Sequence, residues 1–190
     1  MPSSSPGSLL ARLAQALDEA GFRYAVTGGQ ALLLHSRPRT TLDVDVTVAG
    51  YPEDAGRLVE TLRAAGIIPL PDDPLAFAHR HYVIPCLDGA TGLRVDVTIG
   101  FTPYEMEALA RAVTAPVMGC PVHYLAPEDL LVHKLVAWRP QDRVDAQELL
   151  RAQPHMDLAY VRRWLREFEK ALGTRLRARL NRLLRDTRSS

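Results

Sequence analysis

The sequence predicts an α+β domain followed by a helical C-terminal part, and three observations carry this prediction. Short runs of branched and aromatic residues, typical of strands, fall between residues 22 and 124 and alternate with segments of helical periodicity. Beyond about residue 125 only helical patterns remain. The 190 residues are 47% hydrophobic and 24% charged, which is the composition of a globular chain with room for one such domain and a small appendage.

The first elements are expected to be a helix, a strand, a glycine turn and a short helix. Leucines recur at helical spacing over residues 9–17 and stop before Gly21, which indicates an amphipathic helix ended by glycine. Residues 22–27 favour a strand, the pair Gly28-Gly29 makes a turn, and residues 30–35 resume with helix formers.

The next strand carries a polar face. Residues 41–48 alternate branched apolar residues with Asp43, Asp45 and Thr47, which is the two-residue period of a half-buried strand. Residues 93–99 repeat this pattern around Asp96. The remaining expected elements are a helix over 52–65, a loop over 69–74, a strand over 81–86 that forms a hairpin with 93–99, a strand over 122–124, and helices over 127–138, 141–152, 157–171 and 173–186.

Composition excludes several classes of protein. No apolar run approaches the roughly 18 residues of a membrane span, and the N-terminal residues lack the basic and apolar regions of a signal peptide. We therefore expect no membrane association and a cytoplasmic location. Cys86 and Cys120 are too few for a disulfide scaffold or a zinc cluster, so we expect both to be reduced core residues.

Charge is distributed unevenly along the chain. Residues 1–150 hold 12 basic and 18 acidic side chains, a net charge of −6, whereas residues 151–190 hold 11 and 4, a net charge of +7. The sequence therefore predicts a domain over 1–150 and a basic helical extension over 151–190. Either a polyanionic partner near the C-terminal end or a solvated helix face would account for the basic extension.

Three aspartates on the polar faces of the expected strands form the candidate catalytic centre. Asp43 and Asp45 lie two residues apart on one strand, so their carboxylates project from the same face, and Asp96 lies in the same pattern on another strand. Grouped carboxylates repel one another unless cations are present, and hard oxygen ligands of this kind suit Mg²⁺. The alternative is that these aspartates are merely solvated, but Asp is disfavoured in strands and three such placements weaken that interpretation.

A glycine pair precedes these aspartates. At a helix start, the backbone N–H groups of Gly28 and Gly29 can receive phosphate oxygens, because glycine permits a close approach. Taken alone, the pair fits a plain strand-to-helix corner better than a phosphate site. Thirteen residues separate it from Asp43, and this spacing joins the two motifs into one pattern.

The combined pattern resembles the nucleotidyltransferase superfamily of the polymerase-beta type, and two blocks resemble the minimal nucleotidyltransferases of the AbiEii toxin family. The first block reads Gly28-Gly29-x-Ala31, His35, Arg39, Thr41, Asp43 and Asp45. The second reads Pro127-Glu128-Asp129-Leu130, Lys134-Leu135, Ala137, Arg143 and Asp145. This resemblance covers about residues 22–150. It implies a small mixed β-sheet with flanking helices and metal-dependent transfer of a nucleoside monophosphate from an NTP to an acceptor hydroxyl.

The resemblance also implies roles for individual residues. The catalytic set is Asp43, Asp45, Asp96, Lys134 and Asp145, and the nucleotide-binding set is Gly28, Gly29, Arg39, Thr41 and Lys134. Two Mg²⁺ ions, with Mn²⁺ as the alternative metal, would be held by the three aspartates, and pyrophosphate would leave in line. Lys134 starts from an apolar helix stripe, where an ammonium needs an anion. Asp145 likewise needs a partner, for which Lys134, Arg143 and the nucleotide are the candidates. Alternatively, Lys134 reaches water and Asp145 makes a structural salt bridge.

Three functions fit these features. Some relatives in the toxin family add nucleotides to the 3′ end of tRNA, and the basic extension would grip such an RNA through its phosphates. Antibiotic-modifying nucleotidyltransferases share the carboxylate frame, and the net charge of −6 over residues 1–150 suits a cationic drug. The third function is a non-catalytic binding module that retains the fold, against which the three intact aspartates argue.

Thr41 suggests a means of regulation. It lies two residues before Asp43, so on a regular strand its side chain would face the metal side. Phosphorylation there would add about −1.5 to −2 charges and repel the triphosphate. Some relatives are silenced by modification of a hydroxyl residue at this position, so a cognate antitoxin that modifies Thr40 or Thr41 is a hypothesis beside the simpler one of an ordinary strand threonine.

Overall fold

Two units make up the chain, of which the structure, a computed structural model, describes residues 5–36 and 41–188. The first unit comprises Met1–Gln30 and Thr40–Leu125, and the second comprises Ala31–Arg39 and Ala126–Ser190. Each unit has its own buried apolar side chains. The functional division at residue 150, drawn from the charge pattern, stays a prediction.

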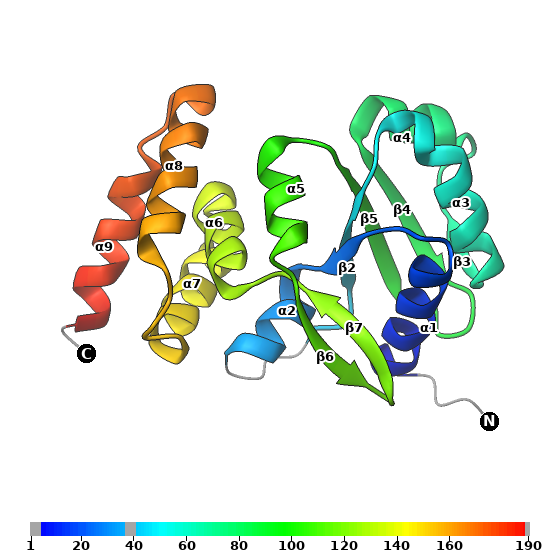
Figure 1. Cartoon of the computed structure of the whole chain (residues 1–190), viewed down its shortest axis with the longest axis horizontal. Helices are drawn as coiled ribbons and strands as arrows, with labels where there is room; N and C mark the ends of the chain where they lie inside the picture. The colour runs from blue at the N-terminus through cyan, green and yellow to red at the C-terminus, as the bar shows by residue number, and fades with distance from the viewer. Residues whose placement is uncertain (1–4, 37–40, 189–190) are drawn as a thin grey trace. The chain divides into compact units, whose positions relative to one another are not determined.

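The described part of the first unit is built on one mixed sheet, with the strand order β3-β4-β5-β2-β1-β7-β6 (Figure 1). The strands are β1 (Tyr24–Val26), β2 (Val44–Ala49), β3 (Ile67–Pro69), β4 (Val83–Asp88), β5 (Arg94–Gly100), β6 (Val113–Val117) and β7 (Cys120–Tyr124). The pairs β2–β5 and β1–β7 are parallel, and the other neighbours are antiparallel. The prediction of an α+β fold with a mixed sheet is confirmed.

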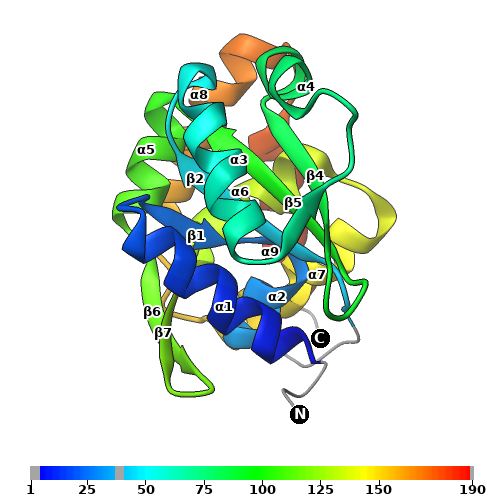
Figure 2. The same ribbon diagram turned by 90° about the vertical axis from the view of Figure 1, so that its right-hand side faces the viewer.

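Alternating residues of β2 and β5 give this sheet one apolar side. Val44, Val46 and Val48 of β2 are each at most 1% exposed, and Val95 and Val97 of β5 are fully buried. Figure 2 shows α1 (Pro6–Glu19) and α3 (Ala55–Ala64) running side by side in front of the strands. Both helices are amphipathic, because their buried residues recur every three or four positions.

The N-terminal helix follows the sequence closely. The Ser5 side chain accepts a hydrogen bond from the Ser8 N–H and begins α1, and the leucines predicted to form its apolar stripe are buried. Gly21 comes after the helix with a φ of 71°, which is a conformation that suits glycine. The predicted amphipathic helix with a glycine stop is therefore confirmed.

Four elements of the first unit were not predicted from the sequence. They are the strands β3 and β6 and the helices α4 (Pro74–His81) and α5 (Pro103–Ala110). A short 3₁₀ helix, η1 (Pro52–Asp54), leads into α3. Both cysteines are free, as expected, but only Cys86 is a buried core residue, because Cys120 is the first residue of β7 and is partly buried.

The described part of the second unit is helical. It contains α6 (Pro127–Ala137), α7 (Pro140–Ala152), α8 (Leu158–Leu172) and α9 (Leu176–Arg188), and the end of α2 (Gly28–His35) belongs to it as well. Leu130, Leu135, Leu149 and Leu165 are fully buried within this unit. The four predicted C-terminal helices are all present, with ends within three residues of the predicted ones.

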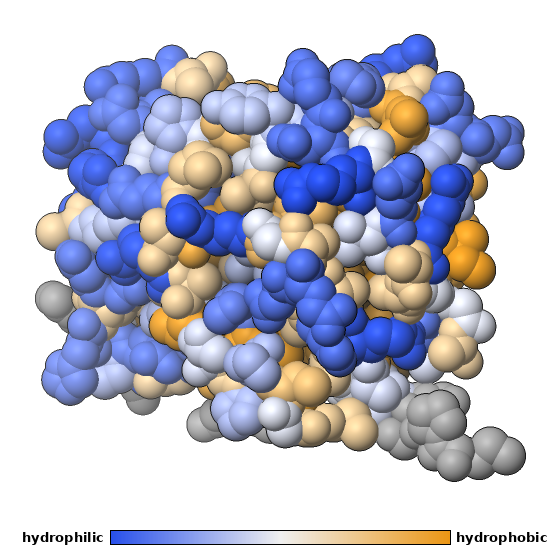
Figure 3. Space-filling model, turned by 45° about the vertical axis from the view of Figure 1, so that its right-hand side comes forward, coloured by the Kyte–Doolittle hydropathy of each residue, from blue (hydrophilic) through white to orange (hydrophobic). Residues whose placement is uncertain are grey.

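The face drawn in Figure 3 is mainly hydrophilic. Charged and polar side chains predominate on it, and apolar ones emerge in small separate patches. Among the described residues, no helix combines the length and the apolar character that a membrane span requires.

Candidate active site

Asp45 and Asp96 lie next to each other on the two central parallel strands. Asp45 of β2 is the register partner of Asp96 of β5, so the two side chains project from the same face of the sheet. The valines on either side of each aspartate point to the opposite, buried face. The alternation of valine and aspartate in the sequence therefore places two half-buried carboxylates side by side.

Asp43 does not lie on the strand, contrary to the prediction. Strand β2 begins at Val44, and Asp43 is exposed just before it. The reason is the length of the neighbouring strand, because β1 ends at Val26 and the chain then turns into α2. The last hydrogen bond from this segment to β2 is donated by the Thr27 N–H to the Asp45 carbonyl, at 2.8 Å. Among the residues that the structure describes, no strand continues the ladder with β2 on this side beyond that point.

The glycine pair forms the first residues of α2 and packs against this site. Gly28 has a φ of 58°, and a Cβ at this position would lie 2.0 Å from Asp45 Oδ2. A Cβ at Gly29 would lie 2.5 Å from Thr41 Oγ1. Only glycine therefore lets the start of α2 come this close to the carboxylate and the hydroxyl. The first N–H groups of a helix have no partner within the helix, so the glycine pair offers donors to an anion.

Asp96 has a neighbouring cation that the sequence analysis did not assign. Arg94 lies two residues earlier on β5, and its Nε is 3.2 Å from each carboxylate oxygen of Asp96. The side chain of Asp96 is 30% exposed and that of Arg94 is 56% exposed. The two-residue strand period would have revealed this pair, because it places Arg94 on the same face as Asp96.

The three aspartates supply ligands of the right chemistry for Mg²⁺, namely carboxylate oxygens. In the described residues, however, no three His, Cys, Asp or Glu side chains come close enough together to hold a metal ion. The structure thus brings Asp45 and Asp96 together, with Asp43 close in the chain. Arg39 and Thr40 lie outside the described residues.

Lys134 and Asp145 form a buried ion pair in the second unit. The ammonium of Lys134 donates to Asp145 Oδ2 at 2.7 Å and to Asp142 Oδ1 at 3.1 Å. Lys134 is 8% exposed and Asp145 is 2% exposed. Gln141 donates to the other Asp145 oxygen at 2.8 Å. Lys134 was among the partners expected for Asp145, whereas the contact of Lys134 with Asp142 was not predicted. Asp142 lies three residues before Asp145 and so on the same helix face.

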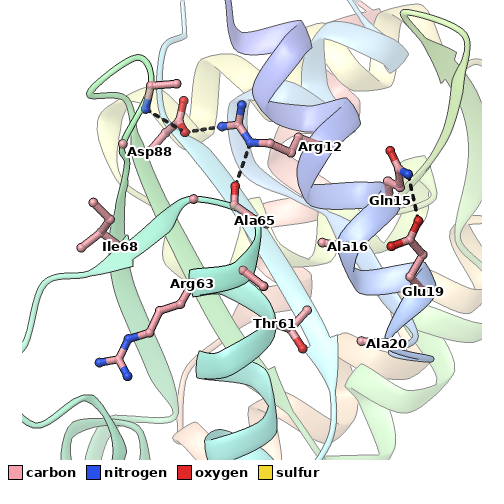
Figure 4. Close-up of a pocket in the computed structure, with 14 residues that line it drawn as sticks. Arg12, Gln15, Ala16, Glu19, Ala20, Thr61, Arg63, Ala65, Ile68 and Asp88 are labelled. Atoms are coloured by element: carbon pink, nitrogen blue, oxygen red, sulfur yellow. Dashed lines mark hydrogen bonds and ion pairs between the residues drawn. The ribbon is translucent and has the colours of Figure 1, made fainter.

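A pocket of about 1060 Å³ lies elsewhere in the first unit, between α1 and α3 (Figure 4). Arg12 of α1 crosses its edge, where it forms an ion pair with Asp88 and donates to the Ala65 carbonyl at 2.9 Å. None of the predicted catalytic or nucleotide-binding residues lines this pocket. Arg12 and Asp88 satisfy each other at this edge, which indicates a structural role for this pair.

A family model matches most of the chain. The model of the family described as the nucleotidyl transferase AbiEii toxin of a type IV toxin–antitoxin system matches residues 8–188. Among curated proteins, none matches this chain.

Solved structures share the fold at low sequence identity. The antibiotic-resistance factor ANT(2″)-Ia has a TM-score of 0.62 at 18% identity, over 88% of this chain and 94% of that one. An antigenic nucleotidyltransferase-like protein from Paracoccidioides brasiliensis has a TM-score of 0.58 at 19% identity, over 94% of each chain. The lincosamide antibiotic adenylyltransferase LnuA has a TM-score of 0.55 at 11% identity, over 77% of this chain and 98% of that one.

Proposed function

Because this chain belongs to the nucleotidyltransferase family of AbiEii toxins from type IV toxin–antitoxin systems, we propose that it transfers a nucleoside monophosphate from an NTP to the 3′ end of tRNA. Its class of activity, nucleotidyl transfer, comes with the family. The acceptor, the metal and the site residues are the subject of the proposal. NTPs and tRNA are cytoplasmic, and so is the proposed reaction.

The observation that supports the proposal most is the pairing of Asp45 with Asp96 beside the start of α2. Two carboxylates from adjacent strands face one side of the sheet, and the Gly28 backbone lies against one of them. The combination of backbone N–H groups at a helix start and paired carboxylates suits a nucleoside triphosphate, because the N–H groups bind its phosphates while the carboxylates hold the accompanying cation.

Asp45 and Asp96, together with Asp43, would hold Mg²⁺. A bound divalent ion neutralises triphosphate charge and lowers the pKa of an acceptor hydroxyl. Arg94 would then exchange its contact with Asp96 for solvent or for substrate phosphate, since its side chain is more than half exposed. Arg39 and Thr41 remain in the proposed nucleotide-binding set.

Lys134 has fewer hydrogen-bond donors to offer a nucleotide than an exposed lysine has. An ammonium has three protons, and two of those on Lys134 go to Asp142 and Asp145. The proposed contact between Lys134 and the nucleotide uses the third. Asp145, which is held by Lys134 and Gln141, would act by positioning the ammonium.

Substitution of the paired aspartates tests the assignment. Purified wild type, Asp45→Asn and Asp96→Asn are incubated with each labelled NTP, Mg²⁺ and total tRNA. We expect the wild type to label tRNA with at least one nucleotide and each variant to lose roughly 10²–10³-fold in rate, as when a group that stabilises transition-state charge is removed. The matched control is Asp72→Asn, an exposed aspartate of the same unit.

Circular dichroism and thermal melting establish that the variants fold. Full activity in either variant would contradict the site, and absence of tRNA labelling by the wild type with all four NTPs would contradict the acceptor. Labelling of another RNA in that case would keep the transferase site and change only the acceptor.

A small-molecule acceptor is the second candidate. The fold is shared with ANT(2″)-Ia, described as an antibiotic-resistance factor, and with LnuA, a lincosamide adenylyltransferase. Residues 1–150 carry a net charge of −6, which would favour a cationic drug. Expression of wild type and Asp45→Asn in a sensitive host distinguishes the two candidates, because only a drug-modifying enzyme raises resistance in an Asp45-dependent way.

Family membership also supports an antitoxin partner, and we propose Thr41 as the place where it acts. The Thr41 hydroxyl faces the Gly29 backbone, so a phosphate there would occupy the space proposed for the nucleotide phosphates. Mass spectrometry after coexpression with the neighbouring reading frame tests this. Absence of phosphate from both Thr40 and Thr41 would contradict the proposal.

A further inference from the structure

The two C-terminal helices concentrate positive charge. Residues 151–190 hold ten arginines and one lysine against four acidic residues. Helices α8 and α9 lie side by side in the second unit, α8 orange and α9 red in Figure 1. Their charged side chains fall into two groups, those that stabilise the helix pair and those that have no partner.

The first group holds the helices in place. Arg179 donates to the Leu135 carbonyl at 2.7 Å and to the Val136 carbonyl at 3.2 Å, at the end of α6. Arg163 lies over the rings of Tyr160 and Trp164. These two arginines satisfy a helix end and cover aromatic side chains, so they are not available to a partner.

The acidic residues of the segment are also engaged. Asp157 caps α8 by accepting from the N–H groups of Ala159 and Tyr160, and Glu167 pairs with Lys170 at 2.9 Å. Glu169 accepts from both the N–H and the Nε of Arg177 at 2.7 Å. Burial alone would raise the pKa of Glu169, but its hydrogen bonds and the charge of Arg177 lower the pKa overall, so this carboxylate stays ionised and paired.

The second group consists of four exposed arginines, none of which has a hydrogen bond or ion pair to a residue that the structure describes: Arg162, Arg166, Arg175 and Arg182. Arg162 and Arg166 lie one turn apart on α8, a separation of about 6 Å along the helix axis. Arg175 and Arg182 lie just before and within α9. These four side chains thus display four of the positive charges of the segment to solvent.

Two of the four line a hollow between the helices. A cleft of about 450 Å³ is bounded by Arg162, Glu169, Arg175, Arg177, Ala178 and Asn181. The Glu169–Arg177 pair cancels within it, so Arg162 and Arg175 leave a net charge of +2. Ala178 and Asn181 are uncharged, so the cleft offers an anion two guanidinium groups that have no described partner.

The chemistry of this surface favours phosphate groups over a membrane. A membrane-surface helix needs an exposed apolar face beside its basic one. The α9 leucines at 176, 180 and 183 are at most 3% exposed, and Val161 and Leu165 of α8 are fully buried. Guanidinium groups bind phosphate through two parallel hydrogen bonds, which several exposed arginines can repeat along a nucleic-acid strand.

We propose that Arg162 and Arg175, which line the α8–α9 cleft, bind phosphates of the RNA acceptor, and that Arg166 and Arg182 on the same two helices bind further phosphates. This inference rests on the proposed function, because it supplies the acceptor that the transferase site needs. Four phosphate contacts predict that the logarithm of the affinity falls against the logarithm of salt concentration with a slope of about −3 to −4.

The test compares Arg162→Ala/Arg175→Ala with the matched control Arg63→Ala/Arg80→Ala, which removes two exposed arginines without described partners from the first unit. Binding of the full-length chain to labelled tRNA is measured by fluorescence anisotropy from 50 to 300 mM KCl, without NTP. We expect the cleft variant to bind on the order of tenfold more weakly at 0.1 M salt and its salt slope to decrease in magnitude by about 2. The control should match the wild type.

Two outcomes would overturn the inference. One is equal affinity and equal salt slope in the cleft variant and the wild type. The other is competition by polyglutamate as effective as that by RNA of equal charge, because the surface would then serve an acidic protein.

The transfer assay separates this inference from the proposed function. If the cleft variant transfers nucleotide with an unchanged KM for tRNA, the inference fails and the function stands. If the wild type binds tRNA through these arginines and transfers no nucleotide, the surface stands and the function fails. A raised KM with an unchanged kcat supports both.

Discussion

At the scale of single residues, the candidate site depends on two places where no side chain can be added. The backbone of Gly28 lies against Asp45, and that of Gly29 lies against Thr41. Glycine is required at the first position for two reasons, since its φ is positive and a Cβ would overlap a carboxylate oxygen. The two reasons can be separated experimentally, because other glycines of the same unit have a positive φ but no atom near the position of a Cβ.

The substitution Gly28→Ala should impair catalysis more than stability. A left-handed alanine costs about 1–2 kcal/mol, and the added Cβ would also displace the Asp45 carboxylate. Because a shift of about 1 Å in a reacting group can cost roughly 10²-fold, we expect a loss of that order in nucleotidyl transfer. Initial rates and urea unfolding of the same preparations measure the two effects.

Gly92→Ala is the matched control. Gly92 has a φ of 70° in the β4–β5 turn, and a Cβ there would meet no atom within 4 Å. It should therefore show a similar loss of stability and retain its activity. Equal activities in the two variants would mean that the contact between Gly28 and Asp45 does not matter for the reaction.

At the scale of the elements, the side chain of Arg12 connects three of them. Arg12 projects from α1, donates to the Ala65 carbonyl after the end of α3, and pairs with Asp88 at the end of β4 (Figure 4). Asp88 is 1% exposed and also accepts from the N–H and hydroxyl of Thr91. The arrangement fixes the N-terminal helix against the sheet.

Arg12→Ala should weaken the first unit. Removal of the guanidinium leaves Asp88 with the donors of its own turn, the Ala90 N–H and the two of Thr91, and loss of a hydrogen bond to a charged group costs about 1.5–3 kcal/mol. Arg63→Ala, which alters the same pocket without removing a described partner, should change the free energy of unfolding by less than about 0.5 kcal/mol. Urea unfolding of both variants measures the difference, and equal midpoints would show that the Arg12–Asp88 pair adds no stability.

The same scale shows what the sequence could and could not reveal. Helices α4 and α5 were missed, although both start with recognisable signals. Asp73 precedes Pro74 at the start of α4, and Thr102 and Glu105 form a capping box at the start of α5. In contrast, β6 is an edge strand whose Pro116 stands opposite Pro121 of β7, and proline lowers the strand signal.

The site was predictable where it followed local periodicity and was not where it depended on tertiary contacts. The two-residue period placed Asp45 and Asp96 on one face of the sheet, and the register then brought them side by side. The displacement of Asp43 from the strand depends on the length of β1, which no pattern within residues 41–48 contains. The pairing of Lys134 with Asp142 required the turn between α6 and α7 to be known.

At the scale of the whole molecule, a buried thiol and two buried tyrosine hydroxyls make the free energy of unfolding vary with pH in the alkaline range. Burial, with a smaller contribution from Asp96, raises the pKa of the Cys86 thiol to about 12. Burial also raises the pKa of Tyr124, and burial together with Asp18 raises that of Tyr24. These groups lie on β4, β7 and β1, so deprotonation of any of them would place a charge inside the sheet of the first unit.

The free energy of unfolding should therefore fall above about pH 9. In the unfolded chain a thiol loses its proton near pH 8.5, whereas folded Cys86 keeps it up to about pH 12. Below the unfolded pKa this stability is fully present, and it is lost as the pH rises towards the folded value, by up to about 1.4 kcal/mol per pH unit for each group. The two tyrosines add to the loss above about pH 10. Urea unfolding at pH 7, 9, 10 and 11 measures the curve.

Cys86→Ala isolates the thiol contribution, because between pH 9 and 10 the cysteine titrates in the unfolded chain before most of the tyrosine does. The variant should have lower stability at pH 7, since a buried side chain has been shortened, but a flatter decline between these two pH values. Cys120→Ser serves as the control, since Cys120 is only partly buried and its removal should leave the slope unchanged. A wild-type stability that stays constant up to pH 11 would mean that the sheet admits water at Cys86 and the two tyrosines.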